Sequence, residues 1–220
     1  MIRVRILTGV TAAGAAALTV PLLGGCAADG LDEPGTTTEV KDVRDAGYNK
    51  ILSFAVTDST PVARRSVITT ENCNSCHGTL AEHGSQRLNV QYCQFCHNAN
   101  ATGDNGSIHL KTLIHKIHTG EDLETESAFS HVKFPGDRRN CVKCHLEDTQ
   151  QLPPPKGSLP TVAPTDFINP MQPATAACLS CHSSQEAASH ALVNTSTLGE
   201  SCSVCHGPSA QFSVDKSHAR

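Results

Sequence analysis

Tryptophan is absent from this chain and other aromatic residues are scarce, which limits the hydrophobic core that side chains alone can build. Phe and Tyr together supply 4% of the 220 residues. A folded chain of this length normally buries most of the surface that it exposes when unfolded. We therefore expect a bulky apolar group other than side chains inside the folded protein.

Positive charge is also in short supply. The formal net charge is −4, and the 195 residues from Cys26 onward hold 15 Lys and Arg against 21 Asp and Glu. Domains that bind nucleic acids present a basic face, so this charge balance argues against a nucleic-acid partner. A repeat of fixed period is lacking as well, which excludes a regular solenoid.

Cysteine, by contrast, is abundant, and it organises the rest of the sequence. Ten of the 11 cysteines fall into five copies of the pattern C-x-x-C-H, and the eleventh is Cys26. We number the copies as motifs 1 to 5 in chain order. They are Cys73–His77, Cys93–His97, Cys141–His145, Cys178–His182 and Cys202–His206.

The pattern C-x-x-C-H is the signature of covalent c-type haem attachment. The two thiols add to the two vinyl groups of haem, and the following histidine is placed beneath the iron as its proximal ligand. Zinc ribbons and disulfides also use paired cysteines, but neither requires a histidine directly after every pair. We predict covalent attachment at Cys73, Cys76, Cys93, Cys96, Cys141, Cys144, Cys178, Cys181, Cys202 and Cys205. The predicted proximal ligands are His77, His97, His145, His182 and His206.

Five porphyrins would supply the apolar mass that the side chains lack, at about 39 residues per haem. We therefore expect the chain not to fold without haem.

The remaining histidines decide whether each haem iron has a sixth ligand or a vacant axial position. A six-coordinate haem mostly transfers electrons, whereas a five-coordinate haem can bind a substrate. Seven of the 12 histidines are not proximal, and Met171 is the only methionine after Cys26, so Met ligation can serve at most one haem. We predict distal ligands at His83, His115, His118, His190 and His218, and expect His109 and His131 to be spare. The count leaves open which distal histidine serves which haem.

His115 and His118 lie three residues apart in the clearest predicted helix, Ser107–Thr119, which Gly120 should end. Residues at this spacing share one face of a helix. They cannot both reach one iron from the same side, so we expect them to serve two haems.

The N-terminal residues 1–25 are typical of a bacterial lipoprotein signal peptide. Arg3 and Arg5 precede an apolar stretch, and Leu23-Gly24-Gly25 leads directly to Cys26. Cleavage there would leave Cys26 as the lipidated first residue, and several acyl chains would anchor it stably to a membrane. An uncleaved membrane helix is the alternative, but the run of about 18 apolar residues is at the lower limit for spanning and is rich in Gly and Ala.

The rest of the chain divides into a tether and a haem domain. Residues 26–70 are predicted to be a lipid-anchored tether with one short strand at Ile51–Val56, and residues 71–220 to be a pentahaem domain. Residues 149–177 hold seven of the 12 prolines and should form an extended connector. We predict a mainly α-helical and irregular fold, with short helices and loops wrapped around five haems and little β structure.

Several stretches together form a recognisable pattern: Cys73–Arg87, Tyr92–Asn98, Leu113–Gly120, Arg64-Arg65, Phe134-Pro135 and Ser213–His218. In motif and order they resemble the OmcA/MtrC family, the outer-membrane multihaem cytochromes of metal-reducing bacteria. The similarity covers about residues 64–220. The resemblance implies a pentahaem domain with closely spaced bis-histidine haems, and it carries distal ligation onto the same five histidines that the count favours. Decahaem members have two such domains, so this chain corresponds to one. A Trp often found before the fourth motif is replaced here by the region of Asn169-Pro170.

The resemblance implies an exported outer-membrane lipoprotein, on the cell surface or the periplasmic face, that carries electrons in extracellular respiration and is not an enzyme. Expected partners are other cytochromes or a porin–cytochrome conduit, with flavins or extracellular metal oxides as acceptors. Two alternatives stay open. A multihaem reductase of a small molecule such as nitrite would need one open haem, often with Lys replacing the motif histidine. A subunit of a cytochrome filament would take a distal histidine from its neighbour.

Overall fold

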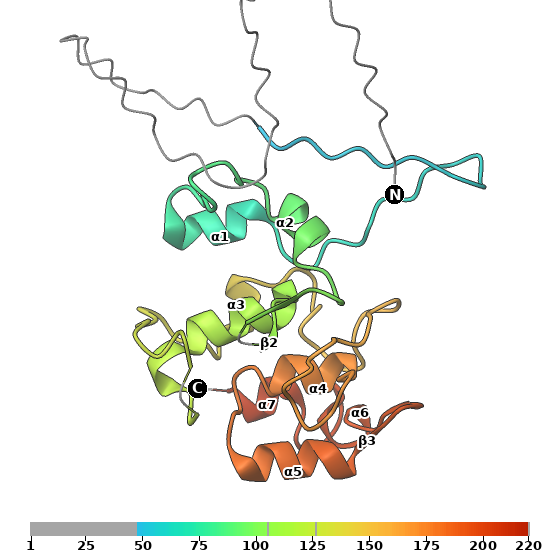
Figure 1. Ribbon diagram of the computed structural model, residues 1–220. Coiled ribbons are helices and arrows are strands. Elements are labelled where there is room, and N and C mark those ends of the chain that lie inside the picture. Colours follow the sequence, from blue (N-terminus) through green and yellow to red (C-terminus); the bar gives the residue numbers. More distant parts are fainter. Residues whose placement is uncertain (1–47, 105, 126, 220) are drawn as a thin grey trace, which may run out of the picture. The chain divides into compact units, whose positions relative to one another are not determined.

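The computed structural model describes residues 48–219 apart from Asn105 and Glu126 (Figure 1). The predicted signal peptide, the lipidation site Cys26 and the first part of the predicted tether lie outside the described residues. Within the described part, no helix is both long enough and apolar enough to cross a membrane.

The described residues form short helices joined by irregular segments. The α-helices are α1 (Thr70–His77), α2 (Val90–Cys96), α3 (Leu110–Thr119), α4 (Pro173–Cys178), α5 (Gln185–Val193), α6 (Ser203–His206) and α7 (Val214–Ser217). The 3-10 turns are η1 (Gly120–Asp122) and η2 (Cys141–Lys143). The strands are β1 (Thr102–Gly103), β2 (Gly106–Ser107), β3 (Thr195–Ser196) and β4 (Gly199–Glu200).

Among the described residues, the strands form two antiparallel ladders of two residues per strand, and the remaining β pairing consists of isolated bridges. Thr102 pairs with Ser107 in the first ladder, and Thr195 pairs with Glu200 in the second. A mainly helical and irregular fold with little sheet was predicted, and the structure confirms it at this level.

Helix α3 is the longest helix of the described part and was predicted from its apolar spacing. It begins at Leu110, three residues later than predicted, because Ser107 belongs to β2 and His109 has a non-helical backbone (φ −55, ψ 130). It ends where predicted, since Gly120 caps it with φ 52. A positive φ of this kind is unfavourable for residues other than glycine.

The short strand predicted at Ile51–Val56 is wrong. These residues have no regular secondary structure, and the side chains of Leu52, Phe54 and Val56 are exposed. A strand needs a neighbouring strand to pair its backbone groups, and none of the described strands pairs with this segment.

The proline-rich connector was predicted to be an extended loop with little regular structure, and the structure shows that it also supplies the core. Ala163, Met171 and Ala176 form the buried hydrophobic cluster. The backbones of Thr161 and Met171 bond reciprocally, with N–H to O distances of 2.7 and 2.8 Å. Proline-rich composition alone does not indicate this burial, because it depends on what the segment contacts.

Small side chains dominate the buried positions of the described residues. The largest fully buried side chains are only threonines and serines, among them Thr112, Thr161 and Ser213. Three of the four apolar residues between the motif cysteines are exposed instead, with Phe95 at 63%, Val142 at 64% and Val204 at 76%, whereas Leu179 packs partly buried against the hydrophobic cluster. This distribution fits a fold that places its main apolar mass against the motifs and not in a side-chain core.

Candidate haem-binding sites

Each motif forms one helical turn. In motifs 2 to 5, the histidine amide donates to the carbonyl of the first cysteine four residues earlier, at 2.9 Å in every case. Motif 1 ends helix α1. The i, i+4 relation places the first cysteine and the histidine on the same face of the turn. A planar group bonded to both thiols would therefore lie over the histidine ring.

Every proximal histidine faces a second histidine ring from another part of the chain. The five pairs are His77 with His118, His97 with His83, His145 with His115, His182 with His218, and His206 with His190. The ring centroids in all five pairs lie 6.0 to 6.1 Å apart. All five histidines predicted as distal ligands are in these pairs, and neither predicted spare is.

This spacing matches two imidazoles on opposite faces of one iron. A metal–imidazole bond of about 2.0–2.1 Å, with each ring nitrogen about 1.2 Å from its ring centroid, gives roughly 6.4–6.6 Å between centroids, close to the observed distances. Aromatic rings that pack directly on each other have centroids about 4.5–7 Å apart, so the distance of a single pair does not require a metal. Nearly the same distance recurs in five pairs, one for each motif, and the imidazole donors fit haem iron between the rings.

Helix α3 contributes one ring to each of two pairs. His115 lies nearly parallel to His145, with an interplanar angle of 8°, whereas His118 and His77 are tilted by 47°. Burial, and after it the nearby His145, lowers the pKa of His115 to about 4. Burial followed by His77 also lowers the pKa of His118. A lowered pKa favours the neutral imidazole, the form that binds a metal.

Hydrogen bonds to Nδ1 orient several of these rings. The Nδ1 of His97 contacts the carbonyl of Ile108 at 2.9 Å, and that of His206 contacts the carbonyl of Phe212 at 2.8 Å. The Nδ1 of His218 contacts the carbonyl of Val214 at 2.8 Å. A ring that donates from Nδ1 to a carbonyl presents the lone pair of Nε2 on its other side, which fixes the ligating nitrogen.

His83 is placed by a tight turn and not by a helix. The backbone amides of Glu82 and Arg87 each donate to the other residue's carbonyl at 3.1 Å. His83 has φ 53, a left-handed conformation that non-glycine residues seldom adopt. Such conformations persist where the surrounding structure holds them, and they cluster at functional sites.

Pairing does not follow sequence order in motifs 4 and 5. His190 comes eight residues after the proximal His182 but faces His206 of motif 5. His218 comes twelve residues after His206 but faces His182 of motif 4. Helix α5 carries His190 away from its own motif, and α7 brings the C-terminal His218 back to motif 4.

The effect of one cysteine thiol on the pKa of another shows which motifs are neighbours. Burial raises the pKa of Cys73, and the nearby Cys144 and Cys93 raise it further, so motif 1 lies beside motifs 3 and 2. Burial, Asp215 and Cys181 all raise the pKa of Cys141, which places motif 3 near motif 4.

Motif 5 follows motif 4 in the same way. Burial raises the pKa of Cys178, and Cys202 adds to that increase. These interactions make motifs 1 and 2, 1 and 3, 3 and 4, and 4 and 5 neighbours, which corresponds to the order 2, 1, 3, 4, 5. All ten cysteines of the motifs are free thiols, so none is committed to a disulfide.

The two spare histidines and Met171 lie elsewhere. His109 is buried and its Nδ1 contacts the Thr161 hydroxyl at 2.8 Å. Burial lowers the pKa of His109 to about 4, with Lys111 and Arg64 contributing. His131 is exposed. Met171 is 4% exposed inside the hydrophobic cluster, which argues against methionine ligation.

Comparison with known proteins gives the family. Residues 65–219 match the family described as "Outer membrane cytochrome MtrC/MtrF-like, domains II/IV". The chain belongs to this family. The OmcA/MtrC resemblance predicted from the motifs is thereby confirmed, and the chain is a multihaem c-type cytochrome of that type.

This cytochrome is similar to MtrC from Shewanella baltica OS185, both in sequence and in a crystal structure. The multiheme cytochrome MtrC is 32% identical over 100 residues, which are 44% of this chain and 13% of the relative. The crystal structure of MtrC matches 74% of this chain and 22% of that chain, with 24% identity and a TM-score of 0.43. The cytochrome thus corresponds to less than a quarter of the length of these relatives.

The sequence identified the paired histidines of this cytochrome, but it did not identify which rings face each other or which backbone carbonyls orient them. The carbonyls of Ile108 and Phe212, which hold proximal rings, carry no side-chain signature. The pairing of motifs 4 and 5 was likewise not predicted, because the histidine count left open which distal histidine serves which motif.

Proposed function

We propose that this cytochrome holds five c-type haems, each between two imidazoles, and conducts electrons through them one at a time. The observation that carries this proposal is that five histidine pairs have nearly equal centroid distances of 6.0 to 6.1 Å. When bound, each haem iron accepts and releases one electron. The chain attaches the haem edge through its thiols and closes both axial positions through its histidines.

The two imidazoles at each motif argue against a substrate-binding iron. A reductase of nitrite or a similar molecule needs one open axial position. Every motif histidine here has an opposing ring, and all ten rings come from the same chain. Because all ten rings come from one chain, the pairs also argue against a filament in which neighbouring subunits exchange ligands.

The spatial order of the motifs suggests a path for electrons. Motifs 2 and 5 lie at the ends of the order, and their distal ligands His83 and His190 are exposed. Motif 3 lies in the middle, and its proposed distal ligand His115 is partly buried. Electrons would enter at one exposed end and leave at the other, while the middle haem acts as an internal relay.

The cellular setting of this proposal rests on the N-terminal sequence and on the family. A lipid anchor at Cys26 would hold the cytochrome at the outer membrane, where it would exchange electrons with other cytochromes or a porin–cytochrome conduit. Because all irons would be closed, reduction of flavins or metal oxides would occur through the haem edge without a substrate pocket. This role is electron transfer and not enzyme catalysis.

A haem count with spectroscopy tests the proposal. The cytochrome is produced in a host with c-type maturation, and haem is quantified per chain by the pyridine haemochrome method. We expect five haems, a low-spin electron paramagnetic resonance spectrum and no binding of carbon monoxide after reduction. A high-spin signal in the native protein, or fewer than five haems, would refute the closed arrangement.

Histidine variants then test the pairs individually. His218→Ala and His190→Ala should each convert one haem in five to a high-spin form that binds carbon monoxide. His131→Ala is the matched control, because His131 is exposed and belongs to none of the pairs, and it should change nothing. Equal spectra for all three variants would contradict the pairing.

Protease treatment of intact cells followed by haem staining tests the location. Loss of the stained band would place the haem domain on the cell surface, and a protected band would place it on the periplasmic face.

A further inference from the structure

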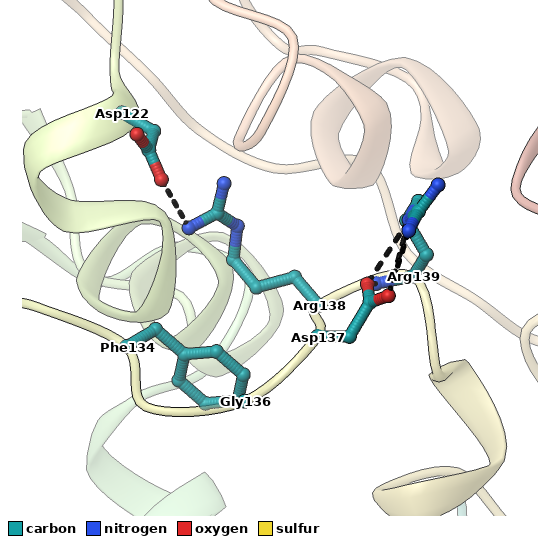
Figure 2. Close-up of a pocket in the computed structure, with 6 residues that line it drawn as sticks. All are labelled: Asp122, Phe134, Gly136, Asp137, Arg138 and Arg139. Carbon is teal, nitrogen blue, oxygen red and sulfur yellow. Dashed lines mark hydrogen bonds and ion pairs between the residues drawn. The ribbon is translucent and has the colours of Figure 1, made fainter. Parts of the chain in front are cut away.

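A cavity lies in the loop that leads from α3 to motif 3. Figure 2 shows its lining residues, Asp122, Phe134, Gly136, Asp137, Arg138 and Arg139. Its volume is about 450 Å³. Two adjacent arginines, Arg138 and Arg139, line this cavity, and the proposed electron-transfer function gives neither of them a role.

Both arginines are held in place by carboxylates. Arg138 donates from Nη1 to Asp122 at 2.6 Å. Arg139 donates from Nε and Nη2 to Asp137, the shorter contact being 2.8 Å (Figure 2). A guanidinium carries five N–H groups in a fixed fork. In the described part of the chain Arg138 uses one nitrogen and Arg139 two, so each keeps N–H groups for another acceptor.

The cavity lies where three of the motifs meet. The Phe134 ring packs edge-on against His118, the proposed distal ligand of motif 1, with centroids 5.2 Å apart.

A second, smaller cavity extends this region toward motif 3. It has a volume of about 180 Å³, and Arg139 lines it together with Cys141 and His218. Arg139 therefore borders both cavities. Groups that belong to motifs 1, 3 and 4 surround the arginine pair.

We propose that Arg138 and Arg139 form a carboxylate-binding site that takes a haem propionate. Arginine binds carboxylates through paired N–H donors, and propionates are the carboxylates that haems attached at the surrounding motifs would bring to this place. This inference rests on the proposed function, because it requires haems at these motifs. It adds two residues that no C-x-x-C-H pattern or histidine count identifies.

The site would set the reduction potential of the haem whose propionate it holds. Reduction adds one negative charge to a haem, and a neighbouring cation favours the reduced state. The arginines also keep the propionate ionised across neutral pH, because an opposite charge favours the charged form of a carboxyl group. With the arginines in place, the potential of that haem depends little on pH between about 6 and 8.

The test uses the haem-loaded cytochrome and the variants Arg138→Gln and Arg139→Gln. Spectroelectrochemical titration should show one of the five potentials lowered, with the reduction equilibrium constant falling about tenfold, or about 59 mV for one electron. That same potential should become pH-dependent and rise as pH falls, because the released propionate takes up a proton. Arg138→Lys keeps the charge without the fork and should restore only part of the potential.

Lys133→Gln is the matched control. Lys133 lies in the same loop and pairs with Glu121 at 3.3 Å, but its side chain is 80% exposed and it does not line the cavity. All five potentials should stay unchanged in this variant. Arg139 is itself half exposed, so its replacement should not prevent folding, and haem content is measured for each variant.

Two outcomes overturn the inference. If the wild-type protein carries five low-spin haems and neither arginine variant moves a potential beyond the Lys133→Gln control, only the propionate site is refuted. If the wild-type protein lacks these haems, the proposed function fails together with the site.

Discussion

Replacing Gly120 with alanine should damage the cytochrome far more than replacing Gly78, although both glycines follow a ligand of the same proposed haem. Gly120 lies two residues after His118, and Gly78 directly follows His77. Both have a positive φ, 52 for Gly120 and 67 for Gly78. The two positions differ in what an added Cβ would meet.

The two substitutions should differ in their cost in stability because the space around the two glycines differs. A Cβ on Gly120 would lie 2.1 Å from the Val132 carbonyl oxygen, whereas a Cβ on Gly78 would meet nothing within 4 Å. Gly78→Ala therefore carries only the cost of a left-handed backbone, about 1–2 kcal/mol. Gly120→Ala adds an overpacking cost of about 1–3 kcal/mol. It also displaces the Val132 carbonyl, which accepts from the Glu121 amide at 3.0 Å.

We expect Gly120→Ala to lose about 3–5 kcal/mol of unfolding free energy, against about 1–2 kcal/mol for Gly78→Ala. Guanidinium unfolding of the haem-loaded protein, followed by the Soret absorbance, measures both values. Because the clash acts at the end of the helix that carries His118, Gly120→Ala should also show a high-spin fraction. Gly78→Ala should stay low-spin.

Equal losses of stability in the two variants would refute this reasoning. They would mean that the Val132 segment moves away without cost, and that the close approach does not hold the end of α3.

Three further predictions concern other parts of the chain. His109→Gln should flatten the pH dependence of stability. In the folded protein the pKa of His109 is lowered from 6.5 to about 4, so its contribution to the free energy of unfolding is complete above pH 6.5 and is lost as the pH falls toward 4. The loss is roughly 2 kcal/mol after allowance for solvent screening. Unfolding at several pH values measures it. Thr161→Val removes the partner of the His109 ring and should destabilise the protein by about 1–3 kcal/mol in the same assay. Cys26→Ser should move the haem-stained protein from the membrane fraction to the soluble fraction, and unchanged membrane association would contradict lipidation.

The comparison of these regions shows what local sequence could and could not predict. Helix α3 was predicted because its apolar spacing and its terminal glycine act within the helix itself. The strand at Ile51–Val56 was predicted from the same kind of local pattern and is wrong, because a strand depends on a partner that the local sequence does not specify. The connector, judged by its prolines, was expected to be a loop, yet residues within it form the buried cluster around Met171.

The candidate sites divide in the same way. The five C-x-x-C-H motifs and the supply of distal histidines follow from the sequence alone, because covalent attachment and axial ligation need particular residue types at short spacing. Which histidine faces which motif, and which arginines border the motifs, depended on the tertiary structure. His190 faces motif 5 and His218 faces motif 4, an assignment that the sequence left open, because ligand pairing depends on how the helices pack and not on distance along the chain. The local sequence therefore determined the motifs and the supply of distal histidines, and only the packing of the chain determined which of them lie together.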